Sequence, residues 1–396
     1  MVEIEFSVIT DEPDGADIFS PLLKEFEAQH PVRVHLRTMT WEQAWPNLLQ
    51  FALYGKGPDV SHIGSTWSNS LVMMNALRPF APHEVAALGG PDAFVPSVWQ
   101  GDERVWTIPW TAYTHVVCYR RDLLKRAGVD EQTAFETAEA VSETFRRLQS
   151  AGVDIPWVIS ADPYPDVLHI AACWVWGAGG DFISDDGTRT LFNQPEALAG
   201  LKAYFELYRY LPPFARLLDT GQRFRLFAGG SAAATVIGST WISASAFQEM
   251  APDVREQLGT AVLLGVPWVG GDNLVVWRYT QSYPDRERAT LSLVSFLTSR
   301  RAQVSHYQAT GFLPARFDAL SELTFEPGSL AQTFDHSFRT GRPYKTVSMW
   351  TTIEHQLGQA LDQVAVEVAA EPADVNAILH KHLDPLAQQL DLMLSR

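Results

Sequence analysis

Tryptophan residues stand beside small and polar residues at several predicted loops of this chain. Trp67 and Trp241 each end a Gly-Ser-Thr-Trp sequence, and Trp268 precedes the run Gly270-Gly271-Asp272-Asn273. A flat indole ring packs against the apolar face of a pyranose, while the sugar hydroxyls need carboxylates, amides and indole N–H groups as partners. The other interpretation is that each tryptophan is a core residue. As a set, the 13 tryptophans favour a site for a sugar.

Signatures of catalysis are missing from the sequence. It contains no G-x-x-x-x-G-K-[ST], G-x-S-x-G or H-E-x-x-H motif, and no G-x-G-x-x-G that follows a strand. The glycines at 177–180 and the pair Asp185-Asp186 before Gly187 are typical of turns. His380 and His382 flank Lys381 near a helix start, where further metal ligands are lacking. We therefore predict no catalytic residue, no metal and no cofactor.

Composition and charge narrow the class of protein. A chain of 396 residues exceeds the usual size of one hydrophobic core, so two lobes are expected. Its formal charge of -16 disfavours nucleic acid and anionic lipid as partners. Cys118 and Cys173 lack metal or redox spacing, so we expect two buried free thiols, with a single disulfide as the alternative. Met1 leads directly into a strand pattern, without the regions of a secretory signal.

The first lobe should be α/β. Residues 2–8 and 32–36 alternate apolar and polar side chains as strands do, and apolar residues at helical spacing lie between them, so the two strands should be parallel. A helix over 45–54, stopped by Gly55, and a short strand near 60–63 follow. Because ligands of open α/β sheets sit beyond the carboxyl ends of strands, the loops at 10–17 and 64–67 are candidate site segments.

The second part of the chain is dominated by helical patterns. They cover residues 122–127, 133–150 and 195–210, with a turn at 184–188. Apolar residues from Leu357 to Val368 and from Leu379 to Met393 mark two amphipathic helices that close the chain. These patterns predict a second lobe.

Four segments carry a resemblance to a known family. They are LLKEFEAQHP at 22–31, the Gly-x-x-Pro-Asp-Val segment within 54–80, VWTIPWTAYTHVVCYRRDLLKRAGV at 105–129, and the stretch 270–320 with Gly-Gly-x-Asn-Leu and TGFLPAR. In this order they resemble the family-1 extracellular solute-binding proteins, the carbohydrate-binding class. The resemblance runs nearly end to end.

The resemblance implies a fold and a cellular role. The fold is the two-lobed α/β arrangement of type II periplasmic binding proteins, with crossing hinge strands and a ligand cleft between the lobes. We place the N-terminal lobe at 1–111 plus 279–316 and the C-terminal lobe at 112–278 plus 317–396. The implied role is that of an exported, monomeric sugar receptor that delivers its ligand to an ABC transporter permease by hinge closure. Export implies a removed leader, and the family is often lipid-anchored.

The resemblance also implies the ligand-binding residues. Those in matching loops are Asp11, Glu12, Trp41, Thr66, Trp67, Trp110, Tyr113, Trp176, Trp241, Trp268, Asp272, Asn273, Arg316, Tyr344 and Trp350. Trp67, Trp241 and Trp268 are expected to stack on the sugar. One alternative is a non-sugar ligand, a polyamine or glycerol phosphate, and another is a carbohydrate-active enzyme, which needs two carboxylates across a glycosidic bond.

Overall fold

The computed structural model describes residues 1–10, 16–99, 104–159, 166–241, 249–325, 329–345, 347–370 and 374–395. Two compact units form: unit 1 comprises 1–113, 269–323 and 346–350, and unit 2 comprises 114–268, 324–345 and 351–396. The α/β class and the two-lobed fold predicted from the sequence are confirmed. The boundaries drawn from the sequence stay a prediction. None of the described helices is both long and apolar enough to cross a bilayer.

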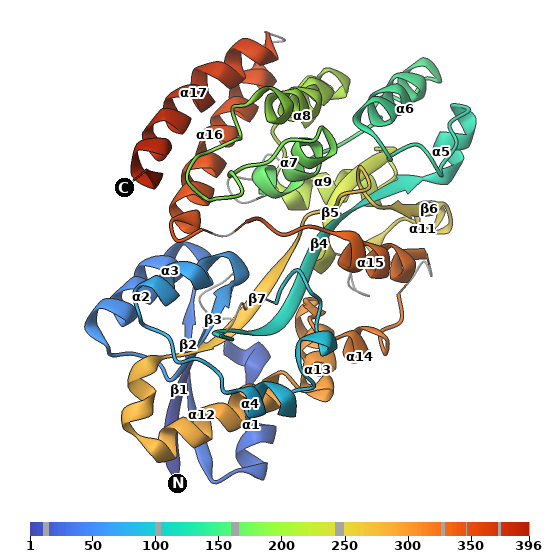
Figure 1. Cartoon of the computed structure of the whole chain (residues 1–396). Helices are drawn as coiled ribbons and strands as arrows, with labels where there is room; N and C mark the ends of the chain where they lie inside the picture. Colours follow the sequence, from blue (N-terminus) through green and yellow to red (C-terminus); the bar gives the residue numbers. More distant parts are fainter. Residues whose placement is uncertain are drawn as a thin grey trace. The chain divides into compact units, whose positions relative to one another are not determined.

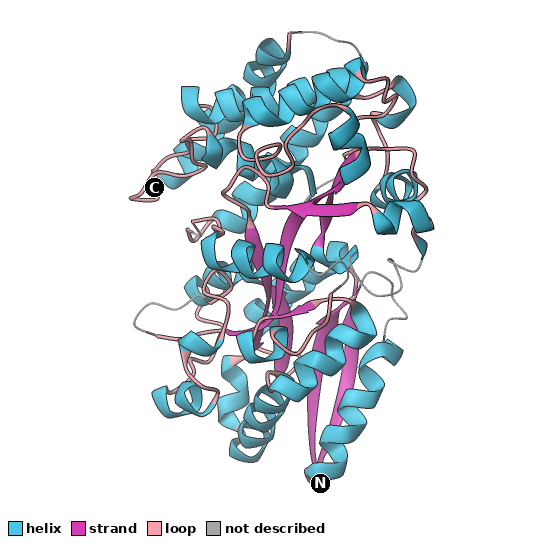
Figure 2. Ribbon diagram, turned by 90° about the vertical axis from the view of Figure 1, so that its right-hand side faces the viewer, coloured by secondary structure: helices cyan, strands magenta, loops and turns pink. Residues whose placement is uncertain are grey.

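Unit 1 is built on a mixed sheet with the strand order β2-β1-β3-β7-β4. Its elements are β1 (Val2–Ile9), α1 (Ala16–Gln29), β2 (Val32–Met39), α2 (Trp41–Tyr54), β3 (Val60–Gly64), η1 (Ser65–Trp67), α3 (Ser68–Met73), α4 (Pro82–Ala87), η2 (Pro91–Ala93), the first part of β4 (Ile108–Arg120), β7 (Val269–Val276), η6 (Arg278–Ser282), α12 (Pro284–Leu297), α13 (Arg300–Thr310), β8 (Leu313–Pro314) and α14 (Phe317–Leu320). β1 and β2 lie side by side and parallel near the N-terminus, as predicted (Figure 2). β3 runs parallel to β1 and antiparallel to β7.

The two faces of this sheet bury different helices. Phe6 of β1 packs with Phe26 of α1 and Leu293 of α12 on one face. Ile63 of β3 packs with Leu48 of α2 on the other. The alternation of side chains along each strand produces both apolar layers, so residues next to each other in β3 belong to opposite faces.

Unit 2 is mostly helical. Its elements are the last part of β4, α5 (Arg121–Arg126), α6 (Ala138–Ser150), α7 (Asp166–Gly177), α8 (Pro195–Glu206), η3 (Leu207–Tyr210), η4 (Pro213–Ala215), α9 (Thr220–Ala228), β5 (Ala234–Gly238), η5 (Ser239–Trp241), α11 (Pro252–Glu256), β6 (Leu258–Ala261), α15 (Ser329–Thr340), α16 (Trp350–Ala370, whose first residue is assigned to unit 1) and α17 (Val375–Leu394). β4 pairs antiparallel with β5 and β6. α8 packs on α7 and α17, and Figure 1 shows α16 and α17 as the last two long helices.

Helix ends differ from the sequence prediction at identifiable caps. The helix predicted from residue 45 begins at Trp41, because Thr40 and Gln43 form a capping box there. The helix predicted from residue 133 begins at Ala138, because the Thr137 side chain accepts a hydrogen bond from the Ala140 N–H. Cys118 and Cys173 are buried free thiols, as expected.

A glycine allows the close approach of α7 and α8. A Cβ added at Gly200 would meet the carbonyl oxygen of Trp174 and lie 2.8 Å from the Val175 Cα. We expect Gly200→Ala to lower the free energy of unfolding by about 3 kcal/mol, since backbone atoms must shift to admit the methyl group. Urea unfolding measures this. Lys202→Ala on the half-exposed side of the same helix is the control, with an expected change of less than about 0.5 kcal/mol. Equal effects of the two substitutions would contradict the close packing.

Candidate functional site

Aromatic rings gather at the ends of strands in unit 1. The rings of Trp41 and Trp45 each lie 5.6 Å from that of Trp67, the Trp41 ring lies 6.0 Å from that of His62, and the His62 ring lies 5.1 Å from that of Trp110. We call these five residues the unit 1 cluster. Trp67 and Trp110 are 7% and 1% exposed, whereas Trp41 is 37% exposed. Trp45 is partly exposed, and Trp41 is therefore the most exposed ring of this cluster.

Local geometry explains why Trp41 stands where it does. It is the first residue of α2, and a Cβ added at Gly64, the last residue of β3, would lie 3.7 Å from the Trp41 ring. A methyl group at position 64 would therefore make ordinary van der Waals contact with both Trp41 and Trp67. Both Gly-Ser-Thr-Trp sequences form the same structure, a short 3-10 helix directly after a strand, as η1 after β3 and η5 after β5.

A buried polar triad lies next to the unit 1 cluster. The Asp272 carboxylate accepts a hydrogen bond of 2.7 Å from the Thr111 hydroxyl and lies 3.3 Å from Nε2 of His62. The Ile9 N–H donates a hydrogen bond of 3.1 Å to Nδ1 of His62, on the other side of the same ring. His62 thus lies between Asp272 and the Trp110 ring. Its expected role toward a ligand stays a prediction.

Removing this carboxylate should cost stability. Asp272→Ala leaves the buried Thr111 hydroxyl without its acceptor and removes the carboxylate beside His62 Nε2, so we expect the free energy of unfolding to fall by about 2 kcal/mol. Urea unfolding followed by tryptophan fluorescence measures the loss. Asp272→Asn keeps one oxygen for Thr111 and should lose less. If Asp272→Ala is as stable as the wild type, the triad has no structural role.

Aromatic rings also gather in unit 2. The His169 ring lies flat on that of Trp268 at 3.9 Å, and His169 Nδ1 is 2.9 Å from the Tyr344 hydroxyl. Tyr344 lies 5.6 Å from Trp176 and 6.1 Å from Trp268 between ring centroids. We call these four residues the unit 2 cluster. All four are buried or nearly so.

Charged groups order one edge of the unit 2 cluster. Asp181 accepts hydrogen bonds from Trp176 Nε1 and from the Arg342 guanidinium, at 3.4 and 2.5 Å, and Lys345 Nζ lies at 2.9 Å. Burial raises the pKa of Asp181, but the Lys345 hydrogen bond, the Phe182 N–H and the two cations outweigh it, so its pKa falls below the usual value. The Arg342 guanidinium also lies 5.0 Å from the Trp176 ring centroid.

The remaining residues expected at the site have other surroundings. Asn273 is fully buried in β7, paired with Ile63 of β3 on the sheet face opposite Asp272. Arg316 binds Asp318 and the Leu88 carbonyl oxygen. Trp350 is fully buried at the start of α16. Thr66 in η1 and Tyr113 in β4 are half-buried.

Three of the expected residues are not placed in full. Asp11 and Glu12 lie outside the described residues, and Trp241 ends η5 with a side chain that is likewise outside them.

Among the expected residues that are described, the structure brings Trp41, Trp67, Trp110 and Asp272 together in unit 1, and Trp176, Trp268 and Tyr344 together in unit 2.

Sequence reasoning missed the histidines of both clusters. His169 and Trp176 stand seven residues apart on α7, a spacing that places both on one helix face and was a usable signal. His62 has no such signal, because its partner Asp272 lies 210 residues further along the chain.

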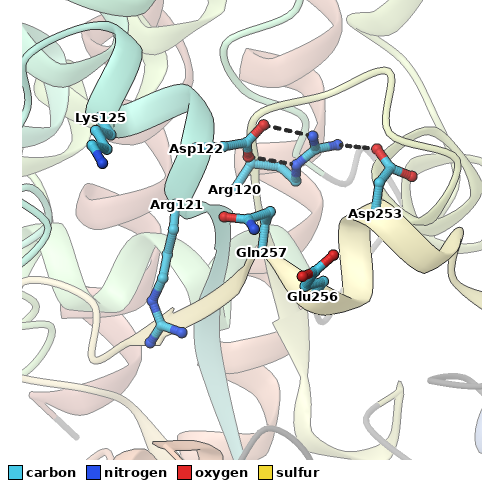
Figure 3. A pocket seen from close by; sticks show the side chains of 7 residues that line it. All are labelled: Arg120, Arg121, Asp122, Lys125, Asp253, Glu256 and Gln257. Carbon is cyan, nitrogen blue, oxygen red and sulfur yellow. Dashed lines mark hydrogen bonds and ion pairs between the residues drawn. The ribbon is translucent and has the colours of Figure 1, made fainter.

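A separate polar pocket of about 370 Å³ lies at the end of β4 in unit 2 (Figure 3). The Arg120 guanidinium at its centre makes two hydrogen bonds of 2.8 Å with Asp122 and lies 3.2 Å from Asp253. The Arg121 side chain is likewise paired with Glu131. Because these charges satisfy one another and none of the described residues that line the pocket is aromatic, it suits a sugar less well than the two clusters.

Comparison with known proteins decides the family. A family model described as a bacterial extracellular solute-binding protein matches residues 22–327, which is most of the chain. The chain belongs to this family. No curated protein matches it in sequence. The family description places such proteins outside the bacterial cytoplasm, and the similar solved structures are binding proteins rather than enzymes.

Several solved structures share the whole fold. The sugar-binding protein MalE from the phytopathogen Xanthomonas citri has a TM-score of 0.81 at 20% identity, over 100% of this chain and 98% of that chain. Maltose-bound MalE3 of T. maritima has a TM-score of 0.76 at 18% identity, over 98% and 100%. An ABC transporter solute-binding protein from Agrobacterium radiobacter K84, in complex with ribitol, has a TM-score of 0.76 at 19% identity, over 98% of each chain.

Proposed function

We propose that this solute-binding protein is the receptor subunit of a bacterial ABC importer and that it binds a sugar, a di- or oligosaccharide, without chemical turnover. The observation that carries the proposal is the pairing of aromatic rings with fixed polar groups in each unit, around Trp41 in unit 1 and around Trp268 in unit 2. Flat apolar rings bordered by hydrogen-bonding groups match the two kinds of surface of a pyranose.

The related structures support the same ligand class. Maltose is bound to the T. maritima protein, ribitol to the A. radiobacter protein, and cycloalternan to a binding protein of Listeria monocytogenes. We extend this class of ligand, uncharged polyols and sugars, to the present chain. Delivery to the membrane permease and a lipid anchor in the full-length protein belong to the same proposal.

A thermal-shift screen tests the proposal. Maltose, maltotriose, cyclic glucans and ribitol are added to the purified protein, with putrescine and glycerol 3-phosphate as the non-sugar series. A sugar at a hundredfold excess over its Kd should add about 2.7 kcal/mol of stability. A clear rise of Tm with a sugar supports the proposal. A rise only with putrescine or glycerol 3-phosphate, or release of shorter sugars from any oligosaccharide, overturns it.

A further inference from the structure

A second pocket lies on unit 1, and none of the described residues that line it belongs to the unit 1 cluster. It has a volume of about 450 Å³ and is formed by the end of α2, the turn after α3 and the short helix η6. Its lining residues are Phe51, Ala52, Gly55, Asn75, Ala76, Arg278, Tyr279, Gln281 and Ser282. We call it the α2–η6 pocket. Its size suits one or two side chains of a partner.

The inner wall of the α2–η6 pocket is preformed. Phe51 and Tyr279 both contact the fully buried Trp277, with ring centroids 5.8 and 6.0 Å away. The Tyr279 hydroxyl donates a hydrogen bond of 2.5 Å to the Pro58 carbonyl oxygen. Since these rings are held by the core, a ligand of the pocket does not have to order them.

The elements that border the pocket carry large apolar side chains on their exposed sides. Leu53 and Tyr54 at the end of α2 are 72% and 75% exposed, and Met73 at the end of α3 is 71% exposed. Exposed apolar residues that gather around a pocket mark interaction sites, and tyrosine, methionine and arginine are enriched in protein interfaces.

The charge of the pocket is opposite to that of the chain. None of the described lining residues is acidic, although the sequence has 46 Asp and Glu against 30 Lys and Arg. Arg278 is exposed, and its guanidinium has no hydrogen bond or ion pair with any residue that the structure describes. Lys56, directly after Gly55, is exposed as well. An uncompensated guanidinium beside apolar side chains calls for a partner carboxylate next to an apolar group.

We propose that the α2–η6 pocket docks an external segment of the transporter's membrane permease that carries an acidic side chain beside an apolar one. The acid would pair with Arg278, and the apolar side chain would enter against Phe51 and Tyr279. A sugar is a poorer occupant, because it would leave the guanidinium without a counter-charge. This inference rests on the proposed role as an importer subunit, and it assigns the partner surface on unit 1.

Site-specific photo-crosslinking tests the docking surface. The photoreactive residue p-benzoylphenylalanine replaces Leu53 in the full chain, and the protein is irradiated with membranes of the source bacterium. We expect an adduct with the permease subunit, identified by mass spectrometry. The same residue at Leu392 of unit 2, which is 68% exposed, is the control and should give none. An adduct only with a second copy of this chain, or no adduct, overturns the proposal.

Charge reversal gives the second arm. Arg278→Glu should lower the yield of the permease adduct and the sugar uptake of complemented cells by at least about tenfold, which corresponds to about 1.4 kcal/mol. Arg301→Glu makes the same charge change at a side chain that is 77% exposed and should leave both unchanged. Equal yields for the two variants overturn the proposal.

The sugar-induced rise in Tm separates this inference from the proposed function. Arg278→Glu should keep the full thermal shift of the wild type, because none of the described residues that line the α2–η6 pocket is a member of either aromatic cluster. If no sugar raises the Tm of the wild-type protein, the sugar-receptor proposal is wrong. The crosslinking experiment tests the docking surface independently of that result.

Discussion

Replacing Trp41 with alanine should weaken sugar binding by about 10- to 100-fold, or about 1.4 to 2.7 kcal/mol. Trp41 is the exposed ring of the unit 1 cluster, whereas Trp67 behind it is buried. Part of the Trp41 ring packs against Trp67 and His62, and the exposed part offers a face on which a sugar can stack. Isothermal titration calorimetry with the sugar identified in the screen measures the change.

Two variants make this result interpretable. Tyr283→Ala removes another exposed aromatic ring of unit 1, one that lies outside the cluster, and should leave the affinity unchanged. Trp41→Phe keeps a smaller ring and should recover part of the affinity. If Trp41→Ala binds as tightly as the wild type, unit 1 contacts the sugar through other residues, and the stacking role of Trp41 is wrong.

The second large effect concerns acid stability. His306 is buried, and its ring stacks on Trp110 with centroids 4.5 Å apart and an interplanar angle of 22°. Burial, together with the nearby His62, lowers the pKa of His306 from 6.5 to about 3, although Asp272 opposes the shift. In the unfolded chain the imidazole takes up a proton below about pH 6.5, whereas in the folded protein it stays neutral.

The sign of the pH effect follows from this difference. The contribution of His306 is fully present above pH 6.5 and is lost as the pH falls toward 3, because the unfolded state then binds one more proton. At pH 5 the loss from this residue should be about 2 kcal/mol. His306→Phe keeps a ring on Trp110 but cannot titrate. The difference in unfolding free energy between wild type and variant should therefore shift by about 2 kcal/mol between pH 7 and pH 5.

Urea titrations at four pH values measure this difference, and carboxylates that titrate in both proteins cancel in it. His83→Gln, at an exposed histidine of unit 1, should show no such shift. A His306→Phe variant whose stability follows the same pH curve as the wild type would show that His306 is protonated in the folded protein.

Local patterns in the sequence predicted much of the fold. The alternation in β1 and β2 and the apolar spacing in α16 and α17 each lie within a short segment, so they can be recognised without knowing the tertiary structure. β4 was harder, because all of its residues except Tyr113 are buried and the strand shows no alternation. Helix starts depended on single caps such as Thr137, which composition does not reveal.

The site was predictable only in part. Trp67 and Trp268 could be named from their polar and small neighbours in sequence, whereas Trp41 came only from the family resemblance. The pairing of His62 with Asp272, and of His169 with Tyr344, joins residues 210 and 175 positions apart. Such contacts depend on strand order and helix packing, which short segments do not encode.

Unit 1 is built from segments that lie far apart in the sequence, and this affects when it can fold during synthesis. Its core joins Ile4 near the start to Ala315, so the ribosome must synthesise the chain past residue 315 before that core is complete. At about 5 to 20 residues per second this takes about 15 to 60 s. During that time β1, β2 and β3 are available without β7, and their apolar faces are open to chaperones. A nascent chain whose core is completed this late remains unfolded for longer, and export machinery that translocates unfolded polypeptides can bind it during that time.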